Sequence, residues 1–365
     1  MRLRPFSLAL ASPLRTAREE LTEREGFLVA VGGPKADGEA FGDARTTGIG
    51  EATPLPGWTE SLPACEAALR EAAAEPTRQG AVLADLDARE TPAARHGLAL
   101  ALDDAAARDA GRSLAAHLAE RVRRVDRSEL PEPAGSVPVN ATVGDGAPES
   151  TAAAAERAVE DGYRCLKVKA GARTLEEDLD RLRSVRQAVG PAIALRVDAN
   201  GAWNRSSARR ALDRLEPLDP AYVEQPLPAA DLAGTADLRA ASDVPIALDE
   251  SLAERSVEAV LDSDAADVLV IKPMALGGPD RALDAALRAR ENGVDPVVTT
   301  TIDAVVARTA AVHVASAVPD VLPCGLATAE LLSSDLAADP CAIDGGRIEV
   351  PDGPGLADGT FDGLL

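Results

Sequence analysis

The spacing of apolar residues divides the chain into two parts. Across residues 1–60, apolar positions alternate with polar ones between Gly- and Pro-rich stretches, which is the pattern of half-buried strands. Strands are predicted at residues 4–11, 25–31 and 47–52. Residues 61–122 instead repeat Ala, Leu, Glu and Arg at helical spacing. The first part therefore predicts an α+β domain, taken as residues 1–125.

The pattern changes after residues 126–136, a stretch with two prolines and a glycine that we interpret as a linker. Short apolar runs then alternate with helical stretches rich in Ala, Arg and Asp, and this alternation predicts parallel strands in an α/β fold. Eight strands are predicted, at residues 137–143, 165–170, 193–200, 222–226, 245–250, 268–273, 296–301 and 321–325. The prediction for residues 136–330 is a barrel of βα units.

Polar residues end successive strands at the period of one βα unit. Asp198, Glu224, Asp249 and Lys272 are separated by 26, 25 and 23 residues, and a barrel of eight such units takes about 250 residues. Each of them comes late in its strand, where the active sites of such barrels are built. The periodicity favours one shared site over separate surface positions.

Asp198, Glu224 and Asp249 form the expected centre of that site. Each follows an apolar run, and a carboxylate buried at a strand end is costly unless it is paired or bound to a cation. Three carboxylates on neighbouring strands would repel one another without a divalent ion. Oxygen ligands with no His or Cys nearby favour Mg²⁺ over Zn²⁺. Mn²⁺ is the other option. The alternative is that each carboxylate caps the helix after its strand.

Three lysines flank the carboxylates. Lys167 and Lys169 lie two residues apart, so both side chains point to one face of their strand, and Lys272 ends the strand after Asp249. A proton alpha to a carboxylate is weakly acidic, and its removal needs a base and a cation that stabilises the enediolate. A lysine beside a metal and a second ammonium group has a lowered pKa and suits the role of base. For any single lysine, a side chain that reaches solvent is the alternative.

Composition limits the other functions. The net charge of −22 argues against nucleic acid and anionic membranes as partners, and no run is apolar enough to span a membrane. Four scattered cysteines favour a reducing cytoplasm. The expected partner is a small-molecule carboxylate, and a homo-oligomer stays open. We hypothesise that the dispersed acidic residues suit a host with high internal salt; equal melting temperatures in low and multimolar KCl would exclude this.

Other motifs carry little chemistry. The sequence has no GxSxG elbow and no GxxxxGK[ST] phosphate loop. Residues 48–51 (GIGE) are not a dinucleotide fingerprint, because the third glycine is missing. His313 falls in an Ala-rich helical run, which predicts a position in the core.

Five stretches together resemble the enolase superfamily, in its muconate-lactonizing subgroup. They are LKVK at 166–169, VDANGAW at 197–203, VEQP at 223–226, ALDES at 247–251 and VIKP at 270–273. The resemblance implies a TIM-like (β/α)7β barrel with an N-terminal α+β capping domain. It also implies that residues 331–365 return to that domain, and that specificity depends on cap loops around 12–18 and 54–58.

Within the subgroup, the chain is most similar to the o-succinylbenzoate synthase family. This resemblance implies a Mg²⁺-dependent syn dehydration of 2-succinyl-6-hydroxy-2,4-cyclohexadiene-1-carboxylate in menaquinone biosynthesis. It makes Lys169 the acid and base, and Lys272 the charge that stabilises the enediolate. Lys167 would set the charge on Lys169, and Asn200 would contact the substrate or support a metal ligand.

The seventh strand departs from this resemblance. Relatives often carry Ser-Ser-x-Glu where this chain reads TTTID at 299–303. Thr300 and Thr301 are the expected substrate contacts, Thr299 offers a third hydroxyl, and Asp303 is the residue that could replace the acid.

Other activities stay open. A racemase or epimerase of the subgroup, acting on N-succinylamino acids or dipeptides, would use Lys169 and Lys272 on opposite faces of the substrate. A muconate-type cycloisomerase would use the same core. Dipeptide epimerases of the subgroup tend to carry Asp-x-Asp on the eighth strand, and residues 322–330 have none. A catalytically silent barrel predicts the loss of a ligand or a lysine, and all are present.

Overall fold

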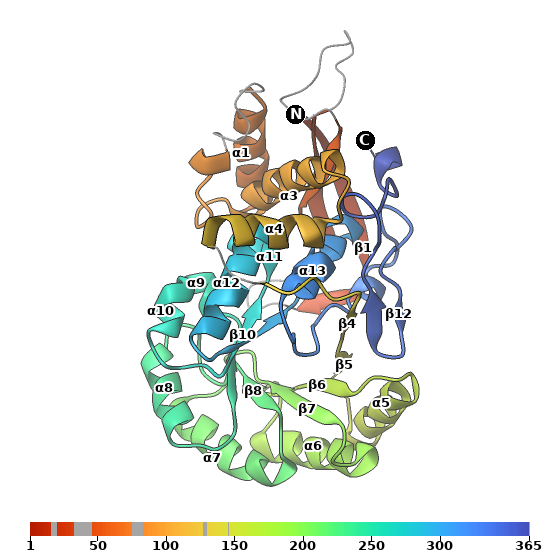
Figure 1. Cartoon of the computed structure of the whole chain (residues 1–365). Helices are drawn as coiled ribbons and strands as arrows, with labels where there is room; N and C mark the ends of the chain where they lie inside the picture. Colours follow the sequence, from red (N-terminus) through yellow and green to blue (C-terminus); the bar gives the residue numbers. More distant parts are fainter. Residues whose placement is uncertain (16–19, 33–45, 75–82, 127–129, 145, 365) are drawn as a thin grey trace.

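Figure 1 shows a cap built from N-terminal residues above a ring of strands and helices. This computed structural model describes residues 1–15, 20–32, 46–74, 83–126, 130–144 and 146–364. The predicted α/β barrel with an N-terminal α+β cap is confirmed. Parts of three predicted segments lie outside the described residues: the cap loop at 12–18, the helical stretch at 61–122 and the linker at 126–136.

The cap is a three-stranded antiparallel sheet covered by helices. Its strands, in sheet order, are β1 (Arg2–Arg15), β2 (Glu20–Val31) and β3 (Gly48–Ala52). Its helices are α1 (Leu62–Ala74), α3 (Pro92–Asp109) and α4 (Leu114–Asp126). Helix α3 packs directly on β3, because a Cβ on Gly50 would lie only 2.0 Å from the carbonyl oxygen of Gly97. The glycines of the GIGE stretch therefore serve close contact between helix and sheet.

The barrel is a parallel sheet whose seven strands follow one another in chain order. They are β5 (Ala141–Val143), β6 (Cys165–Lys169), β7 (Ala194–Asp198), β8 (Tyr222–Glu224), β9 (Ile246–Leu248), β10 (Val268–Ile271) and β11 (Asp295–Val298). The helices around them are α5 (Pro148–Glu160), α6 (Leu175–Val189), α7 (Arg205–Leu215), α8 (Leu232–Ala240), α9 (Ser251–Glu254), α10 (Val257–Leu261), α11 (Pro273–Leu276), α12 (Pro279–Glu291) and α13 (Val305–Ala317). Most residues of the short strands are buried on both faces, as is usual for parallel strands inside a ring of helices, and β5 is the most exposed of them.

Two predicted barrel strands are corrected by the structure. The run at 137–143 is divided into β4 (Ser136–Pro138) and β5, because the chain leaves one sheet for another at Val139 and Asn140. The eighth strand at 321–325 is reduced to two bridges, Cys324 with Val139 and Gly325 with Thr299. Pro323 has no N–H to donate, which shortens this pairing. These bridges join the two edges of the seven-stranded sheet and close the ring.

The C-terminal segment contacts both parts of the molecule. Strands β12 (Ile343–Asp344) and β13 (Arg347–Glu349) form a small antiparallel sheet with β4. Further on, the N–H of Leu356 donates to Asp104 of α3 at 2.8 Å, and Asp362 pairs with Arg108 at 2.7 Å. These contacts agree with a return to the cap, while the domain boundaries themselves stay a prediction.

A buried glutamate docks the cap onto the barrel. Glu51 of β3 is fully buried, and its carboxylate accepts hydrogen bonds from the N–H groups of Ala304 and Ala307, both at 2.8 Å, at the start of α13. Burial, with the nearby charge of Asp303, raises the pKa of Glu51 to about 8. Arg24 of β2 lies beside it and donates to the carbonyl oxygens of Thr53, Pro54 and Ile302. The cap is thereby fixed to the loop after β11.

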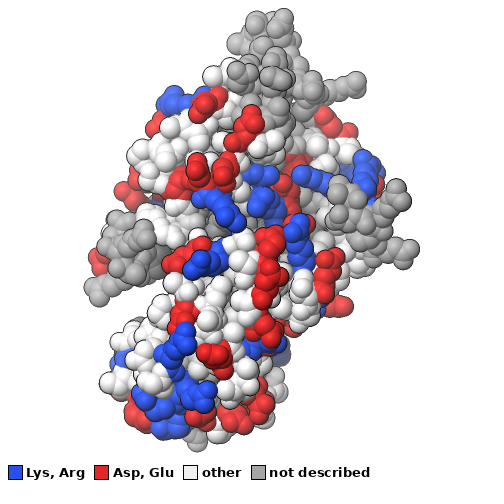
Figure 2. All heavy atoms as spheres, turned by 90° about the vertical axis from the view of Figure 1, so that its left-hand side faces the viewer, with Lys and Arg blue, Asp and Glu red and all other residues white. Residues whose placement is uncertain are grey.

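Small residues fill the core, as expected from the 2% aromatic content. Every residue of α13 is buried, and His313 within it contacts the carbonyl oxygen of Leu356 at 2.7 Å, so its predicted core position is confirmed. The four cysteines are free and buried. In Figure 2 acidic and basic side chains are interspersed over the face in view. Over the described ranges, no helix has the length and apolarity needed to cross a membrane.

Candidate active site

Side chains from five neighbouring strands meet at the carboxyl end of the barrel sheet. In the backbone register, Lys169 of β6 pairs with Asp198 of β7, and Asp198 pairs with Glu224 of β8. Asp249 follows the last residue of β9, and Lys272 follows the last residue of β10. The order of these residues around the ring is the one predicted from their spacing.

Lys167 lies between two of the carboxylates. Its Nζ is 2.9 Å from Oδ2 of Asp198 and 2.7 Å from Oε1 of Glu224. Burial works against its charge, but Glu224 and Asp198 outweigh burial and raise the pKa of Lys167 well above its usual value. Lys167 is therefore a fixed ammonium group at neutral pH.

The two carboxylates beside Lys167 differ in their tendency to hold a proton. Burial alone would raise the pKa of Asp198, yet Lys167 and Lys169 bring this pKa below its usual value. Burial and the charge of Asp198 raise the pKa of Glu224 to about 7. The site thus holds more negative charge than Lys167 alone can balance.

Lys169 is the most accessible of the three lysines. Its side chain is 40% exposed, against 17% for Lys167 and 10% for Lys272. Its Nζ donates to Oδ2 of Asp198 at 2.8 Å and to Oδ1 of Asn200 at 3.0 Å. The Asn200 amide in turn donates to Glu250 at 3.0 Å, from a backbone with a φ of 44°. Asn200 therefore fixes the direction of the Lys169 side chain.

Lys272 pairs with the third carboxylate. Its Nζ lies 2.8 and 2.7 Å from the two oxygens of Asp249. The same Nζ lies 3.2 Å from the centre of the Trp58 ring, a cation–π contact. Burial raises the pKa of Asp249 by more than Lys272 lowers it. Since Trp58 comes from the predicted cap loop at 54–58, the cap contacts this site directly.

Gln225 supports the site and was not predicted from the sequence. Its buried side-chain oxygen accepts from the N–H groups of Asp249 and Ser251 at 3.1 and 3.2 Å, and its amide donates to Leu227 and Ser251. Its φ is 41°, a strained value for a residue other than glycine. The sequence signal that could have indicated this role is a polar amide directly after Glu224, at the end of a predicted buried strand.

The residues after β11 are buried or half-buried, and their side chains form hydrogen bonds. Thr299 donates to the carbonyl oxygen of Gly325 at 2.7 Å, and the hydroxyl groups of Thr300 and Thr328 lie 3.2 Å apart. Thr301 donates to Asp303. Substrate contact by Thr300 and Thr301 stays a prediction, and the hydroxyl hydrogen of Thr301 is engaged within the protein.

A divalent cation fits the chemistry of the carboxylates. Across the described segments, no three His, Cys, Asp or Glu side chains form a ready metal cage, and the ammonium groups of Lys167 and Lys272 face the carboxylates instead. The donors Asp198, Glu224 and Asp249 are all oxygen, which suits Mg²⁺. Oε2 of Glu224 is buried without a hydrogen-bond partner, a costly state that a cation would relieve. Their role as metal ligands stays a prediction.

Comparison with known proteins defines the class of the chain. Residues 150–357 match the family described as Enolase C-terminal domain-like, and this stretch contains all six lysines and carboxylates of the site. The chain belongs to the enolase superfamily.

Individual relatives carry out more than one reaction. The chain is 42% identical over 212 residues to an o-succinylbenzoate synthase of Thermobifida fusca (strain YX). This match covers 56% of this chain and 63% of the relative. It is 34% identical over 218 residues to an L-Ala-D/L-Glu epimerase of Bacillus subtilis (strain 168). That match covers 59% of this chain and 60% of the relative. The chain thus spans less than two thirds of each of these relatives.

Solved structures match along almost the whole chain. A substrate-liganded L-Ala-D/L-Glu epimerase from Bacillus subtilis has a TM-score of 0.82 and 27% identity, covering 98% of this chain and 97% of that one. A dipeptide epimerase from Methylococcus capsulatus, complexed with Mg and the dipeptide L-Arg-D-Lys, has a TM-score of 0.81 and 28% identity, covering 98% of both chains. The superfamily is established, and the reaction has to be argued from the site.

Proposed function

We propose that this chain is an o-succinylbenzoate synthase, a Mg²⁺-dependent dehydratase that converts 2-succinyl-6-hydroxy-2,4-cyclohexadiene-1-carboxylate to o-succinylbenzoate and water. The observation that carries the proposal is the position of Lys169 and Lys272 at opposite ends of an arc of three carboxylates. The 42% identity to the Thermobifida fusca enzyme favours this reaction over others of the subgroup.

Lys169 is the base in this mechanism, and later the acid. Its neutral Nζ takes the proton alpha to the substrate carboxylate, and the electrons of the C–H bond move into that carboxylate group. They then return to form the ring double bond and expel the hydroxyl group from the neighbouring carbon. Lys169 gives its proton to the departing hydroxyl on the same face, so water leaves and the amine is neutral again.

The other residues supply charge and direction. Mg²⁺ held by Asp198, Glu224 and Asp249 would add positive charge at the substrate carboxylate. Lys272 adds an ammonium group from the opposite side. Asn200 holds Nζ of Lys169 on one line of approach, and Lys167 balances the buried charge of Asp198 and Glu224.

A racemase or epimerase is the second candidate. It is supported by the similarity to the Bacillus subtilis epimerase and by a lysine on each side of the carboxylates. A dipeptide carries an ammonium group, which needs an acidic partner. Near Thr300, the end of the barrel offers the Thr328 hydroxyl, and residues 324–328 contain no acid. This chemistry favours the dehydratase, or a substrate without an ammonium group.

The test is an assay of the cyclohexadiene substrate with wild type, Lys169→Ala, Lys272→Ala and an exposed control on α6, Arg183→Ala. We expect Lys169→Ala to lose about 10²–10⁴-fold in kcat, the usual effect of losing a general acid or base. The control should keep the wild-type rate. A near-full rate for Lys169→Ala would contradict the assignment of the base. Proton exchange of N-succinylamino acids in D₂O, without dehydration, would support the second candidate.

The setting follows from the reaction. The proposed product places the enzyme in menaquinone biosynthesis, and four free, buried cysteines suit the reducing cytoplasm. Loss of turnover in EDTA, restored by MgCl₂ and compared with MnCl₂, tests the metal. Unchanged turnover in EDTA would contradict the metal requirement.

A further inference from the structure

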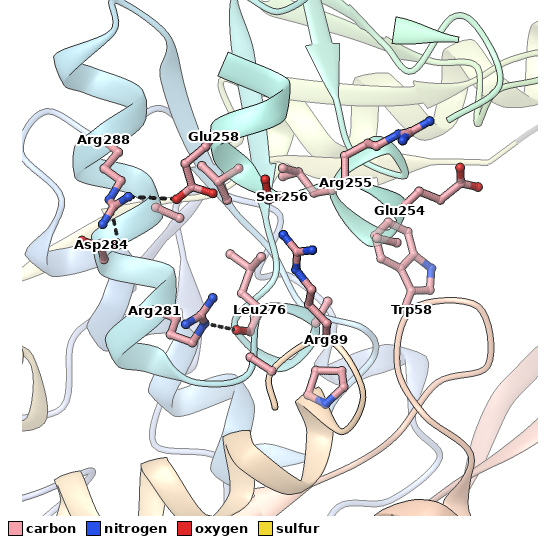
Figure 3. Close-up of a pocket in the computed structure, with 17 residues that line it drawn as sticks. Trp58, Arg89, Glu254, Arg255, Ser256, Glu258, Leu276, Arg281, Asp284 and Arg288 are labelled. Carbon is pink, nitrogen blue, oxygen red and sulfur yellow. Dashed lines mark hydrogen bonds and ion pairs between the residues drawn. The ribbon is translucent and has the colours of Figure 1, made fainter. Parts of the chain in front are cut away.

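A hollow that is separate from the candidate active site lies between the cap and the helices α9 to α12. Its volume is about 330 Å³, which is within the range of small-molecule sites. Figure 3 shows its walls, formed by the cap segment around Arg89, the turn between α9 and α10, and helices α11 and α12. Trp58 closes one side, and this is the ring that lies against Lys272. None of the six lysines and carboxylates of the candidate active site lines the hollow.

Arginines line this hollow although the whole chain has a net charge of −22. Arg288 is neutralised by Glu258 at 2.8 Å and by Asp284 at 2.9 Å. Arg281 donates through Nε to the carbonyl oxygen of Leu276 at 2.9 Å, and among the described residues its two terminal nitrogens make no hydrogen bond. Within the part of the chain that the structure describes, the guanidinium group of Arg89 makes no hydrogen bond or ion pair.

Figure 3 shows how two of these side chains lie. Arg281 extends from α12 and ends beside Leu276, while Arg89 extends from the cap and its guanidinium group lies higher in this view, on the other side of Leu276. The acidic Glu254 lies on the far side, near Trp58. The acids close to Arg281, namely Glu258 and Asp284, are already paired with Arg288. Two guanidinium groups thus line the hollow, Arg89 from the cap and Arg281 from the barrel. Glu258 is the acid whose charge acts on Arg281, and it is bonded to Arg288 at 2.8 Å.

We propose that this hollow binds a small dianion, either a dicarboxylate or a phosphate monoester, between Arg89 and Arg281. Guanidinium groups bind carboxylate and phosphate oxygens through pairs of parallel hydrogen bonds, which gives such a ligand a defined position. Arg89 belongs to the cap and Arg281 to the barrel, so the ligand links the two parts. Trp58 lines the same hollow, so its fluorescence reports on a ligand bound there. The site goes beyond the proposed dehydratase reaction and does not depend on it.

Tryptophan fluorescence tests this site directly, since the chain has two tryptophans, Trp58 and Trp203. In a Trp203→Phe background, the signal of Trp58 is followed while succinate, and separately glucose 6-phosphate, is added at constant ionic strength held with KCl. We expect a saturable change with at least one of these probes. The double variant Arg89→Gln/Arg281→Gln should weaken binding by at least about tenfold, because it removes both groups that form charge-assisted hydrogen bonds with the dianion. The control Arg183→Gln, on α6, should bind as wild type.

Several outcomes would overturn the proposal. They are a linear response to both probes, a response of equal size with added KCl alone, or unchanged binding by the double variant. If the double variant melts at a lower temperature than wild type, Arg89→Lys and Arg281→Lys keep the charge and lose the paired geometry. They should then bind more weakly than wild type while melting normally. Because this readout needs no turnover, its failure is distinct from a failure of the proposed reaction.

Discussion

Lys167 and Lys169 donate to the same atom, Oδ2 of Asp198, at 2.9 and 2.8 Å. Two ammonium groups this close are tolerated because Asp198 and Glu224 provide opposing charge on the next two strands. The two lysines differ in accessibility, because Lys167 is 17% exposed and held by two carboxylates while Lys169 is 40% exposed. This contrast supports the proposal that Lys167 is a fixed charge and that Lys169 contacts the substrate.

Lys167→Met should therefore make stability depend on divalent cations. The variant leaves Asp198 and Glu224 facing each other in a buried space, and we expect a loss of about 3–5 kcal/mol in the free energy of unfolding in EDTA, the usual cost of breaking a buried pair. Millimolar MgCl₂ should restore part of this loss, because the cation opposes the same charges. Urea denaturation in EDTA and in MgCl₂ measures both effects.

The matched control is Lys169→Met, which removes the exposed lysine from the same carboxylate. It should cost less than about 1 kcal/mol, since a partly exposed pair contributes little. Equal losses for the two variants, or an unfolding free energy of Lys167→Met that is the same with and without MgCl₂, would contradict this account of the site.

Gln225→Leu tests whether the buried amide positions Asp249. Leucine has a similar size but cannot accept from the N–H groups of Asp249 and Ser251. Each unpaired buried group costs about 1–3 kcal/mol, and loss of a residue that orients a metal ligand typically weakens metal binding by about 10–100-fold. Urea denaturation and calorimetric titration with MgCl₂ measure the two effects. Gln187→Leu, at an exposed position of α6, should change neither, and unaltered Mg²⁺ affinity in Gln225→Leu would argue against a positioning role.

The arc of lysines and carboxylates could be predicted because one strand ends every 23 to 26 residues. In a parallel barrel, that period alone brings Asp198, Glu224, Asp249 and Lys272 to one end of the ring. The alternation of apolar and polar residues also predicted the three strands of the cap, since alternation along a half-buried strand is a local property of the sequence.

Contacts between distant segments could not be predicted in this way. Glu51 and Ala304 are 253 positions apart, and nothing near either residue indicates that they meet. Trp58 against Lys272 is a similar case. The eighth strand was overestimated because apolar residues at 321–325 resemble a strand, whereas Pro323 limits the pairing to two bridges. Local patterns predict helices and strands, whereas contacts between distant residues depend on how those helices and strands pack together.

Glu51→Ala tests how strongly the cap is docked on the barrel. The variant leaves the N–H groups of Ala304 and Ala307 without their partner at the start of α13. We expect a loss of about 2–4 kcal/mol in the free energy of unfolding, because two buried N–H groups lose the carboxyl oxygens that accept from them. Turnover should fall as well, because Arg24 and the loop after β11 lose their support.

Glu66→Ala, which breaks a partly exposed pair with Arg70 on α1, should cost less than about 0.5 kcal/mol. A similar small loss for both variants would mean that Glu51 does not hold the cap in place.

Buried histidines should make the fold sensitive to mild acid. Burial lowers the pKa of both His96 and His313 from 6.5 to about 4, despite a hydrogen bond from each ring to a carbonyl oxygen. Between these pH values the two histidines bind more protons in the unfolded chain than in the folded one. Their contribution to stability is therefore complete above about pH 6.5 and falls as the pH drops toward 4. Each histidine should account for about 3 kcal/mol of this loss.

His313→Gln isolates one of these two contributions. Glutamine can still donate to the carbonyl oxygen of Leu356 but does not titrate. Between pH 7 and pH 4 the variant should lose about 3 kcal/mol less stability than wild type, as measured by urea denaturation at intervals across this range. Ser316→Ala, on the same buried helix, removes the hydrogen bond to Ala134 and should lower stability by a similar amount at every pH. If His313→Gln and wild type lose stability in parallel as the pH falls, His313 is not the group that titrates.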